Sequence, residues 1–272
     1  MPELPEITIL SKQMTKEITG KQIQKVEVHQ PKCLNIPPER FVETAIGKTI
    51  GQIYNRGKWL FTKLEPDHYL LINLGMGADL LYFAPNSKLP EKHQFKLTFT
   101  DYSGFTIRFY WFGYIHLLPQ KELSQHKLTA KLEVSASSKE FTKEHLQKLL
   151  KKRKARIKSL LLDQKNIAGI GNVYIQDILF NARLHPNRKA SSLSDQEISN
   201  LYDATKTVLN SSIEKGGLAY EKNFYGQKGN FGAEDFQVGY KTGKPCPICS
   251  TRIEKIRTGT TSSYICPKCQ KL

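Results

Sequence analysis

Four cysteines near the C-terminus constrain the fold more than any other feature of this chain. They form two pairs, Cys246-Pro-Ile-Cys249 and Cys266-Pro-Lys-Cys269, separated by sixteen residues. Each pair places two thiolates on one tight turn, and two such turns can close a tetrahedron around Zn²⁺. The segment between them predicts two short strands, 251–256 and 262–265. The alternatives are two disulfides or four reduced thiols, and disulfides are disfavoured because no secretory signal is visible.

A zinc-stapled hairpin of this size has no core of its own. The metal must therefore supply its folding free energy, which is roughly 10–16 kcal/mol in zinc-finger peptides. The hairpin is also basic, with seven Lys or Arg against one acidic residue over 239–272. Such a unit is suited to lie on phosphates.

The whole chain shares this basic character. It has 41 Lys and Arg against 25 Asp and Glu, a net charge of +16. A surplus that large suits a polyanionic partner, either nucleic acid or an anionic membrane. The first 20 residues contain no continuous apolar region, and the longest apolar stretches, such as 69–76, are only strand-length. We therefore expect a soluble, cytoplasmic nucleic-acid-binding protein without membrane attachment.

The 272 residues divide into a β-rich half and a helical half. Residues 5–19 have helical periodicity, and alternating patterns then predict a β-sandwich or barrel. The predicted strands are 50–54, 58–64, 68–74, 94–101 and 104–110. Helical periods follow at 141–152, 155–163, 173–183 and 195–215. Ser194 is a candidate N-cap, with Glu197 completing a capping box.

The expected architecture is α+β: an N-terminal helix plus β-sandwich domain, then a helical domain carrying the zinc hairpin. The predicted boundaries are 1–120 for the first domain, 121–138 for a linker, 139–238 for the helical domain and 239–272 for the zinc finger. Within the helical half, seven of the eleven residues over 148–158 are Lys or Arg. This run predicts either phosphate contact or a solvated face.

A glycine-rich turn opens one of the predicted helices. Its sequence is Ala168-Gly169-Ile170-Gly171-Asn172. Glycines let a backbone approach a ligand closely, and a helix N-terminus offers free N–H groups to a phosphate. An ordinary interhelical turn remains the alternative.

The N-terminus offers a candidate nucleophile. The chain begins Met1-Pro2-Glu3-Leu4-Pro5-Glu6, and removal of Met1 would leave Pro2 with a free secondary amine. An α-amino group titrates near about 8, so part of it is neutral and nucleophilic at pH 7. Such an amine can attack a sugar C1′ and form an iminium, with Glu3 as acid or base. A plain helix-start signal is the alternative, and a retained Met1 would make Pro2 an unreactive amide.

In combination, the N-terminal hexapeptide, Gly169-Ile170-Gly171-Asn172 and the four-cysteine finger resemble the bacterial formamidopyrimidine-DNA glycosylase and endonuclease VIII family. Leu4 resembles the residue found at this position in the formamidopyrimidine branch of the family. The resemblance covers the whole chain. It implies a base-excision repair enzyme that flips a damaged base from DNA, cleaves the glycosidic bond and nicks the strand by β,δ-elimination. It also implies a helix–two-turn–helix DNA-binding domain and one structural zinc.

The resemblance also assigns roles to single residues. Pro2 corresponds to the Schiff-base nucleophile, Glu3 to the general acid/base, and Lys58 to a lysine held near the reacting sugar and its phosphate. Met76 corresponds to a wedge that fills the gap left by the flipped base, with a core methionine as the alternative. The remaining DNA contacts that we expect are Lys158, Gly171, Asn172, Arg257 and Thr261. The zinc ligands are Cys246, Cys249, Cys266 and Cys269.

The sequence departs from the family pattern in places that grip DNA. The loop that usually supplies two further void fillers is shortened here to 108–113, where Trp111 or Phe112 is the candidate substitute. Thr261 stands where an arginine is usual, and Arg257 is a candidate replacement. Asp177 stands in place of a glutamate, and Asn73 in place of a histidine.

Three hypotheses follow. The first is a DNA glycosylase that acts on oxidised or ring-opened bases and also has abasic-site lyase activity. We expect it to act on double-stranded DNA as a monomer without a small-molecule cofactor. Its expected location is the bacterial nucleoid. The second is a protein of the same fold that binds damaged or branched DNA without processing it. An RNA-binding zinc-ribbon protein ranks third, because it leaves the N-terminal motif unexplained.

Overall fold

The computed structural model describes residues 2–151 and 153–272, which form two compact units. The N-terminal unit contains the chain up to residue 131 together with 215–230, and the C-terminal unit contains 132–214 and 231–272. The expected linker at 121–138 is therefore divided between the two units. Segment 215–230 follows the last long helix in sequence but belongs to the β-rich unit.

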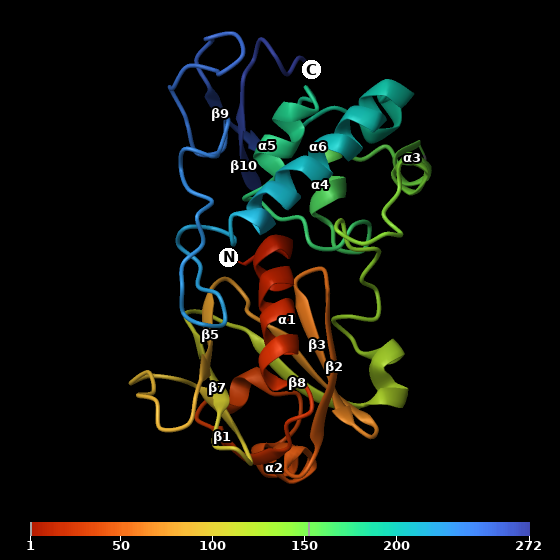
Figure 1. Ribbon diagram of the computed structural model, residues 1–272. Coiled ribbons are helices and arrows are strands. Elements are labelled where there is room, and N and C mark those ends of the chain that lie inside the picture. Colours follow the sequence, from red (N-terminus) through yellow and green to blue (C-terminus); the bar gives the residue numbers. More distant parts are fainter. Residues whose placement is uncertain (1, 152) are drawn as a thin grey trace. The chain divides into compact units, whose positions relative to one another are not determined.

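The N-terminal unit consists of a helix and two antiparallel four-stranded sheets (Figure 1). Helix α1 spans Leu4–Ile18 and contacts β2 and β3 of one sheet. That sheet has the order β2-β3-β4-β8, with bounds Thr49–Arg56, Trp59–Glu65, His68–Asn73 and Tyr114–Pro119. The other has the order β1-β6-β7-β5, with bounds Ile23–Val28, Phe95–Phe99, Gly104–Phe109 and Ala78–Phe83. A short helix α2 (Pro38–Ala45) and two 3₁₀ turns, η1 (Pro31–Cys33) and η2 (Gln120–Gln125), complete the unit.

One apolar cluster joins the two sheets and α1, as the predicted sandwich requires. Ile7, Leu10 and Met14 of the helix pack with the inward-facing residues of both sheets. Phe224, from the returning segment, is fully buried in the same cluster, and its backbone oxygen accepts a hydrogen bond from the Tyr82 amide at 2.7 Å. This burial explains why 215–230 belongs to the N-terminal unit.

The C-terminal unit is helical and carries the cysteine hairpin. Its helices are α3 (Lys143–Lys151), α4 (Ile157–Leu162), α5 (Ile175–Asn181) and α6 (Asp195–Glu214), with a 3₁₀ turn η3 at Ala190–Ser192. Strands β9 (Glu254–Thr258) and β10 (Thr261–Ile265) form the two-stranded hairpin, and β10 contacts α5. Each helix predicted for this unit is present, with its described ends at most two residues inside the predicted ones; residue 152, the predicted end of the first, lies outside the described residues.

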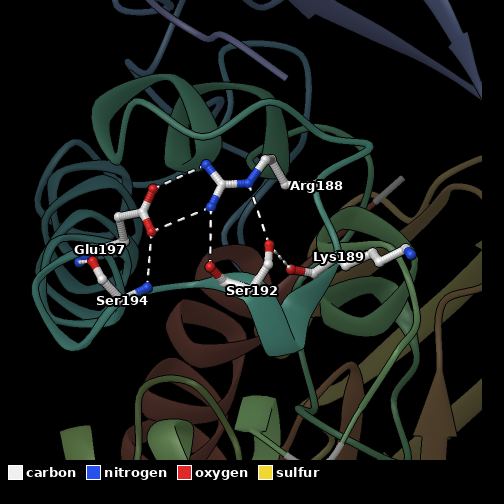
Figure 2. A network of polar contacts seen from close by, with 5 residues as sticks. All are labelled: Arg188, Lys189, Ser192, Ser194 and Glu197. Atoms are coloured by element: carbon white, nitrogen blue, oxygen red, sulfur yellow. Dashed lines mark hydrogen bonds and ion pairs between the residues drawn. The ribbon is translucent and has the colours of Figure 1, made fainter.

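The predicted capping box at the start of α6 is confirmed (Figure 2). The Ser194 hydroxyl accepts the Glu197 amide at 3.2 Å, and the Glu197 carboxylate accepts the Ser194 amide at 2.8 Å. The same carboxylate receives two bonds from the Arg188 guanidinium, at 3.0 and 3.3 Å. Arg188 also donates to Ser192, so the network fixes the chain that enters α6.

Candidate active site and nucleic-acid interface

The first residues of α1 are buried and held by reciprocal hydrogen bonds. Pro2 is buried and Glu3 has no exposed surface. The Glu3 carboxylate accepts the Glu6 amide, while the Glu6 carboxylate accepts the Glu3 amide at 2.8 Å. The other carboxylate oxygen of Glu6 accepts the Leu218 amide at 3.2 Å. Glu6 therefore fixes the backbone beside Pro2, and the spacing Glu3-x-x-Glu6 is the sequence signal that identifies it.

Lys58 lies in the two-residue turn between β2 and β3, because Arg56 pairs with Trp59. Helix α1 runs antiparallel to β2. The Asn55 amide contacts the Thr8 hydroxyl at 3.3 Å, the Thr15 hydroxyl contacts the Ile53 oxygen at 3.4 Å, and Gly20 bonds to Ile50. Beyond Asn55, β2 therefore continues toward the N-terminal end of α1. Lys58 is thus at the same end of this unit as Pro2 and Glu3.

A second loop carries Met76, whose side chain is 54% exposed and therefore not part of the core. A hydrogen bond of 2.9 Å from the Tyr110 amide to the Gly77 oxygen joins this loop to the shortened loop at 110–113. Tyr110, Trp111 and Phe112 are 52%, 80% and 53% exposed. Two adjoining loops therefore present four large apolar side chains to solvent.

In the C-terminal unit, two glutamines shape the glycine-rich turn. Gln164 accepts the Gly169 amide at 2.8 Å and donates to the Ile170 oxygen at 2.9 Å. Gln176 donates to the backbone and side-chain oxygens of Asn172, at 2.8 and 3.2 Å. Gly171 is buried and Asn172 is half-buried. Nothing in the sequence pattern marked the two glutamines, because most of their partners are backbone groups.

Lys158 is buried instead of lying open on the basic surface. It is 1% exposed, and its ammonium donates to the Ser262 oxygen and, at 3.0 Å, to the Ser263 hydroxyl of β10. Burial lowers its pKa to about 8. In the described structure its ammonium connects α4 to the cysteine hairpin.

The tip of the hairpin holds the two other expected contacts. Arg257 is exposed, and its Nε donates to the Gly259 oxygen at 3.3 Å. The Thr261 hydroxyl donates to the Thr258 oxygen at 3.2 Å, so it closes the turn between β9 and β10. Arg257 and Ser262 are directly paired across the two strands, which places the guanidinium one residue pair away from Thr261.

Asp177, one of the departures from the family pattern, anchors the segment that leads into the hairpin. Its carboxylate accepts the amides of Gln237, Val238 and Gly239 at 2.8 to 3.0 Å. Burial raises its pKa, and these three bonds oppose that effect. The short aspartate side chain thereby satisfies three consecutive backbone donors.

The four cysteines converge as the spacing predicted. Their sulfur atoms lie within 4.8 Å of one another, with Cys249 at 3.4 Å from both Cys266 and Cys269. A tetrahedral zinc with bonds of 2.3 Å needs sulfur atoms about 3.8 Å apart. All four are free thiols, which excludes the disulfide alternative. The site fits one structural zinc ion with no open coordination position.

Family models match the chain in the same three parts. Residues 1–110 match the formamidopyrimidine-DNA glycosylase N-terminal domain, 132–223 the helix–two-turn–helix domain of the same enzymes, and 243–272 the zinc finger of these enzymes and isoleucyl-tRNA synthetase. A β-sandwich with a buried N-terminal proline, followed by such a helical unit and finger, defines the class of zinc-finger DNA glycosylases.

The chain belongs to the formamidopyrimidine-DNA glycosylase family. It is 38% identical to the formamidopyrimidine-DNA glycosylase of Pelotomaculum thermopropionicum over the full length of both chains, and 34% identical to that of Bacillus subtilis over 99% of both. Two solved structures of the Lactococcus lactis enzyme superpose with TM-scores of 0.90 and 0.89 at 28% identity, over 100% and 99% of this chain and all of theirs. Those enzymes are bound to DNA containing an N7-benzyl-Fapy-dG or an abasic site. In the part of the chain described, no helix is long and apolar enough to cross a bilayer.

Proposed function

We propose that this DNA glycosylase removes oxidised or ring-opened bases from duplex DNA and then cleaves the strand at the abasic site. The observation that carries the proposal is the grouping of Pro2, Glu3 and Lys58 at one end of the N-terminal unit. Burial around Pro2 keeps water away from an amine that must be unprotonated to react. Its family membership and its DNA-bound structural neighbours support the same activity.

The proposed chemistry uses groups of this chain alone. The Pro2 nitrogen attacks C1′ of the damaged nucleotide, and the base leaves with the electrons of the glycosidic bond and takes up a proton. Glu3 gives a proton to O4′ as the C1′–O4′ bond of the ring breaks, and the proline nitrogen loses its own proton, so an iminium forms. The resulting iminium acidifies the C2′ hydrogen, so successive eliminations expel the 3′ and 5′ phosphates. Lys58 lies near the sugar and its phosphate, where a positive charge stabilises the developing negative charge.

The exposed apolar loops supply the wedge in this proposal. Met76 fills the gap left by the flipped base, and Trp111 or Phe112 stacks against the remaining bases. Such contacts offset part of the unstacking cost of a few kcal/mol. Gly171, Asn172, Arg257 and Thr261 contact phosphates. Lys158 is 1% exposed and its ammonium already binds two serine acceptors of β10, so we assign it first to holding the hairpin.

A monomer acting in the bacterial cytoplasm on nucleoid DNA completes the proposal, and the zinc is the one cofactor that it requires. The second candidate, a damage-binding protein without catalysis, is motivated by Thr261 and by the shortened loop. Met1 lies outside the described residues, so the state of the Pro2 amine is settled by mass measurement.

Borohydride trapping separates the two candidates. Protein whose mass confirms loss of Met1 is incubated with an abasic-site duplex and reductant, and we expect a covalent protein–DNA band. The same protein with Met1 retained is the matched control and should give no band, because its Pro2 nitrogen is an amide. Binding without a band in the processed protein would support the non-catalytic candidate.

A further inference from the structure

We propose that Asn73 is a positioning residue that couples the turn carrying Lys58 to the loop carrying Met76. The inference rests on the proposed function, because it concerns how two of its residues are held in register. It rests on the side-chain amide of Asn73, whose nitrogen and oxygen each make a hydrogen bond. The Asn73 amide nitrogen donates to the Lys58 oxygen at 3.0 Å, and its oxygen accepts the Gly75 amide at 3.0 Å.

The Lys58 turn needs this support because the sheet does not provide it. The ladder between β3 and β4 ends at the pair of Leu60 and Ile72, so the Lys58 oxygen lies beyond these paired strands. Trp59, the next residue, is buried against Tyr114 with ring centroids 5.8 Å apart. The chain after Lys58 is therefore fixed by packing, and the Asn73 amide fixes the Lys58 peptide itself.

The Met76 loop is held on its other side. Gly75 has a φ of +57°, and a Cβ at this position would lie 1.5 Å from the Phe112 oxygen. Only glycine fits there, so the backbone passes close to the 110–113 loop. The bond from the Gly75 amide to Asn73 sets the direction in which the chain turns just before Met76.

Because the Asn73 side-chain amide binds both the Lys58 turn and the Met76 loop, it fixes the position of one relative to the other. Lys58 acts at the sugar and phosphate, whereas Met76 occupies the space of the extruded base, so catalysis requires a constant spacing between them. A misplacement of about 1 Å in an active site can reduce the rate roughly a hundredfold. Loss of the coupling should therefore reduce the rate of base excision much more than the affinity for DNA.

Two variants and one control test the inference. Asn73→Ala removes both bonds, whereas Asn73→Asp keeps the acceptor for Gly75 and replaces the donor to Lys58 with a second oxygen. Asn35→Ala is the matched control, since Asn35 makes the same kind of paired bonds to the Leu117 backbone, at 3.0 and 2.8 Å, in the same unit. Single-turnover excision of a ring-opened purine from duplex DNA is measured, together with Kd.

For Asn73→Ala we expect an excision rate about tenfold to a hundredfold lower, with Kd changed less than about threefold. Asn73→Asp should lose most of the same rate, because it breaks the bond to Lys58. Asn35→Ala should excise at the wild-type rate. An Asn73→Ala rate equal to wild type would overturn the inference, and so would an equally large loss in Asn35→Ala.

A measurement on the free protein separates failure of this inference from failure of the proposed function. Hydrogen exchange of the peptide containing residues 74–77 should be faster in Asn73→Ala than in wild type, and unchanged in Asn35→Ala. If wild-type protein does not excise, the proposed function fails, and this exchange alone decides whether the coupling exists. Unchanged exchange in Asn73→Ala would overturn it.

Discussion

Thr261 is a single-residue departure from the family pattern at the tip of the hairpin. An arginine at this point of the hairpin would offer a planar, bidentate charge to phosphates, whereas threonine offers one hydroxyl. In the structure that hydroxyl is directed to the Thr258 oxygen and closes the turn. The position therefore serves the local fold, and Arg257 on the neighbouring strand is an exposed arginine in the adjacent residue pair.

Thr261→Arg should strengthen binding to an abasic-site duplex about tenfold. It should also make the slope of log affinity against log salt concentration steeper, by the amount that corresponds to one phosphate contact. The physical reason is one additional charge-assisted contact at the hairpin tip. Binding titrations at several KCl concentrations measure both quantities. Thr260→Arg, an exposed neighbour with the same added charge, is the control. An equal gain from both variants would show that only net charge matters.

At the scale of elements, β8 is joined to the residue that follows η2 through a pair of histidines, of which His116 is buried and His126 is half-buried. His116 Nδ1 lies 2.8 Å from His126 Nε2, and His126 Nδ1 lies 2.7 Å from the Thr129 hydroxyl. The ring of Trp59 packs against both histidines. Burial, followed by the neighbouring His126, lowers the pKa of His116 to about 4.

The histidine pair predicts acid sensitivity. Between pH 6.5 and about 4 the unfolded chain binds a proton at His116 that the folded chain does not, so stability falls as the pH falls through this window. His116→Gln cannot titrate and should lose less stability over the same range. The difference is at most about 3 kcal/mol. Thermal unfolding of both proteins from pH 7 to 4 measures it, and parallel curves would contradict the assignment.

Among the elements, strands joined to a neighbour by a short turn were predictable, whereas strands whose partners lie far away in the sequence were not. Helices α1 and α3 to α6 and strands β2, β3, β4, β6 and β7 lie close to their predicted ranges, whereas helix α2 was missed. Strand β8 was missed although its burial pattern is the same as that of β4, because β4 follows β3 after a two-residue turn whereas β8 pairs with the distant β4. Strands β1 and β5 were also missed. Their place in the sheet is set by pairing with β6 and β7, which are distant in sequence.

For the whole molecule, the net charge of +16 dominates encounter with DNA. Phosphate contacts release counterions, so affinity should fall linearly with the logarithm of salt concentration, with a slope of about −0.9 per contact. We expect a slope of roughly −3 or steeper for undamaged duplex between 50 and 200 mM KCl.

Preference for a lesion should respond differently to salt, because base extrusion and wedge contacts release few counterions. The ratio of affinities for abasic and undamaged duplex should therefore stay nearly constant over the same range. Competition with structured RNA in the same titrations tests the RNA-binding hypothesis. A flat salt dependence, or stronger binding to RNA, would contradict a role on duplex DNA.

Local chemistry in the sequence was sufficient for the zinc ligands, the capping box at Ser194 and Glu197, and the family. Each of these features consists of short motifs whose residues lie a few positions apart, so each motif can be read from the sequence without knowledge of the fold. Only the tertiary structure placed 215–230 in the β-rich unit, buried Lys158 against β10, and joined Asn73 to Lys58 and Gly75. Those contacts depend on strand order and on burial, which bring together groups that no local pattern connects.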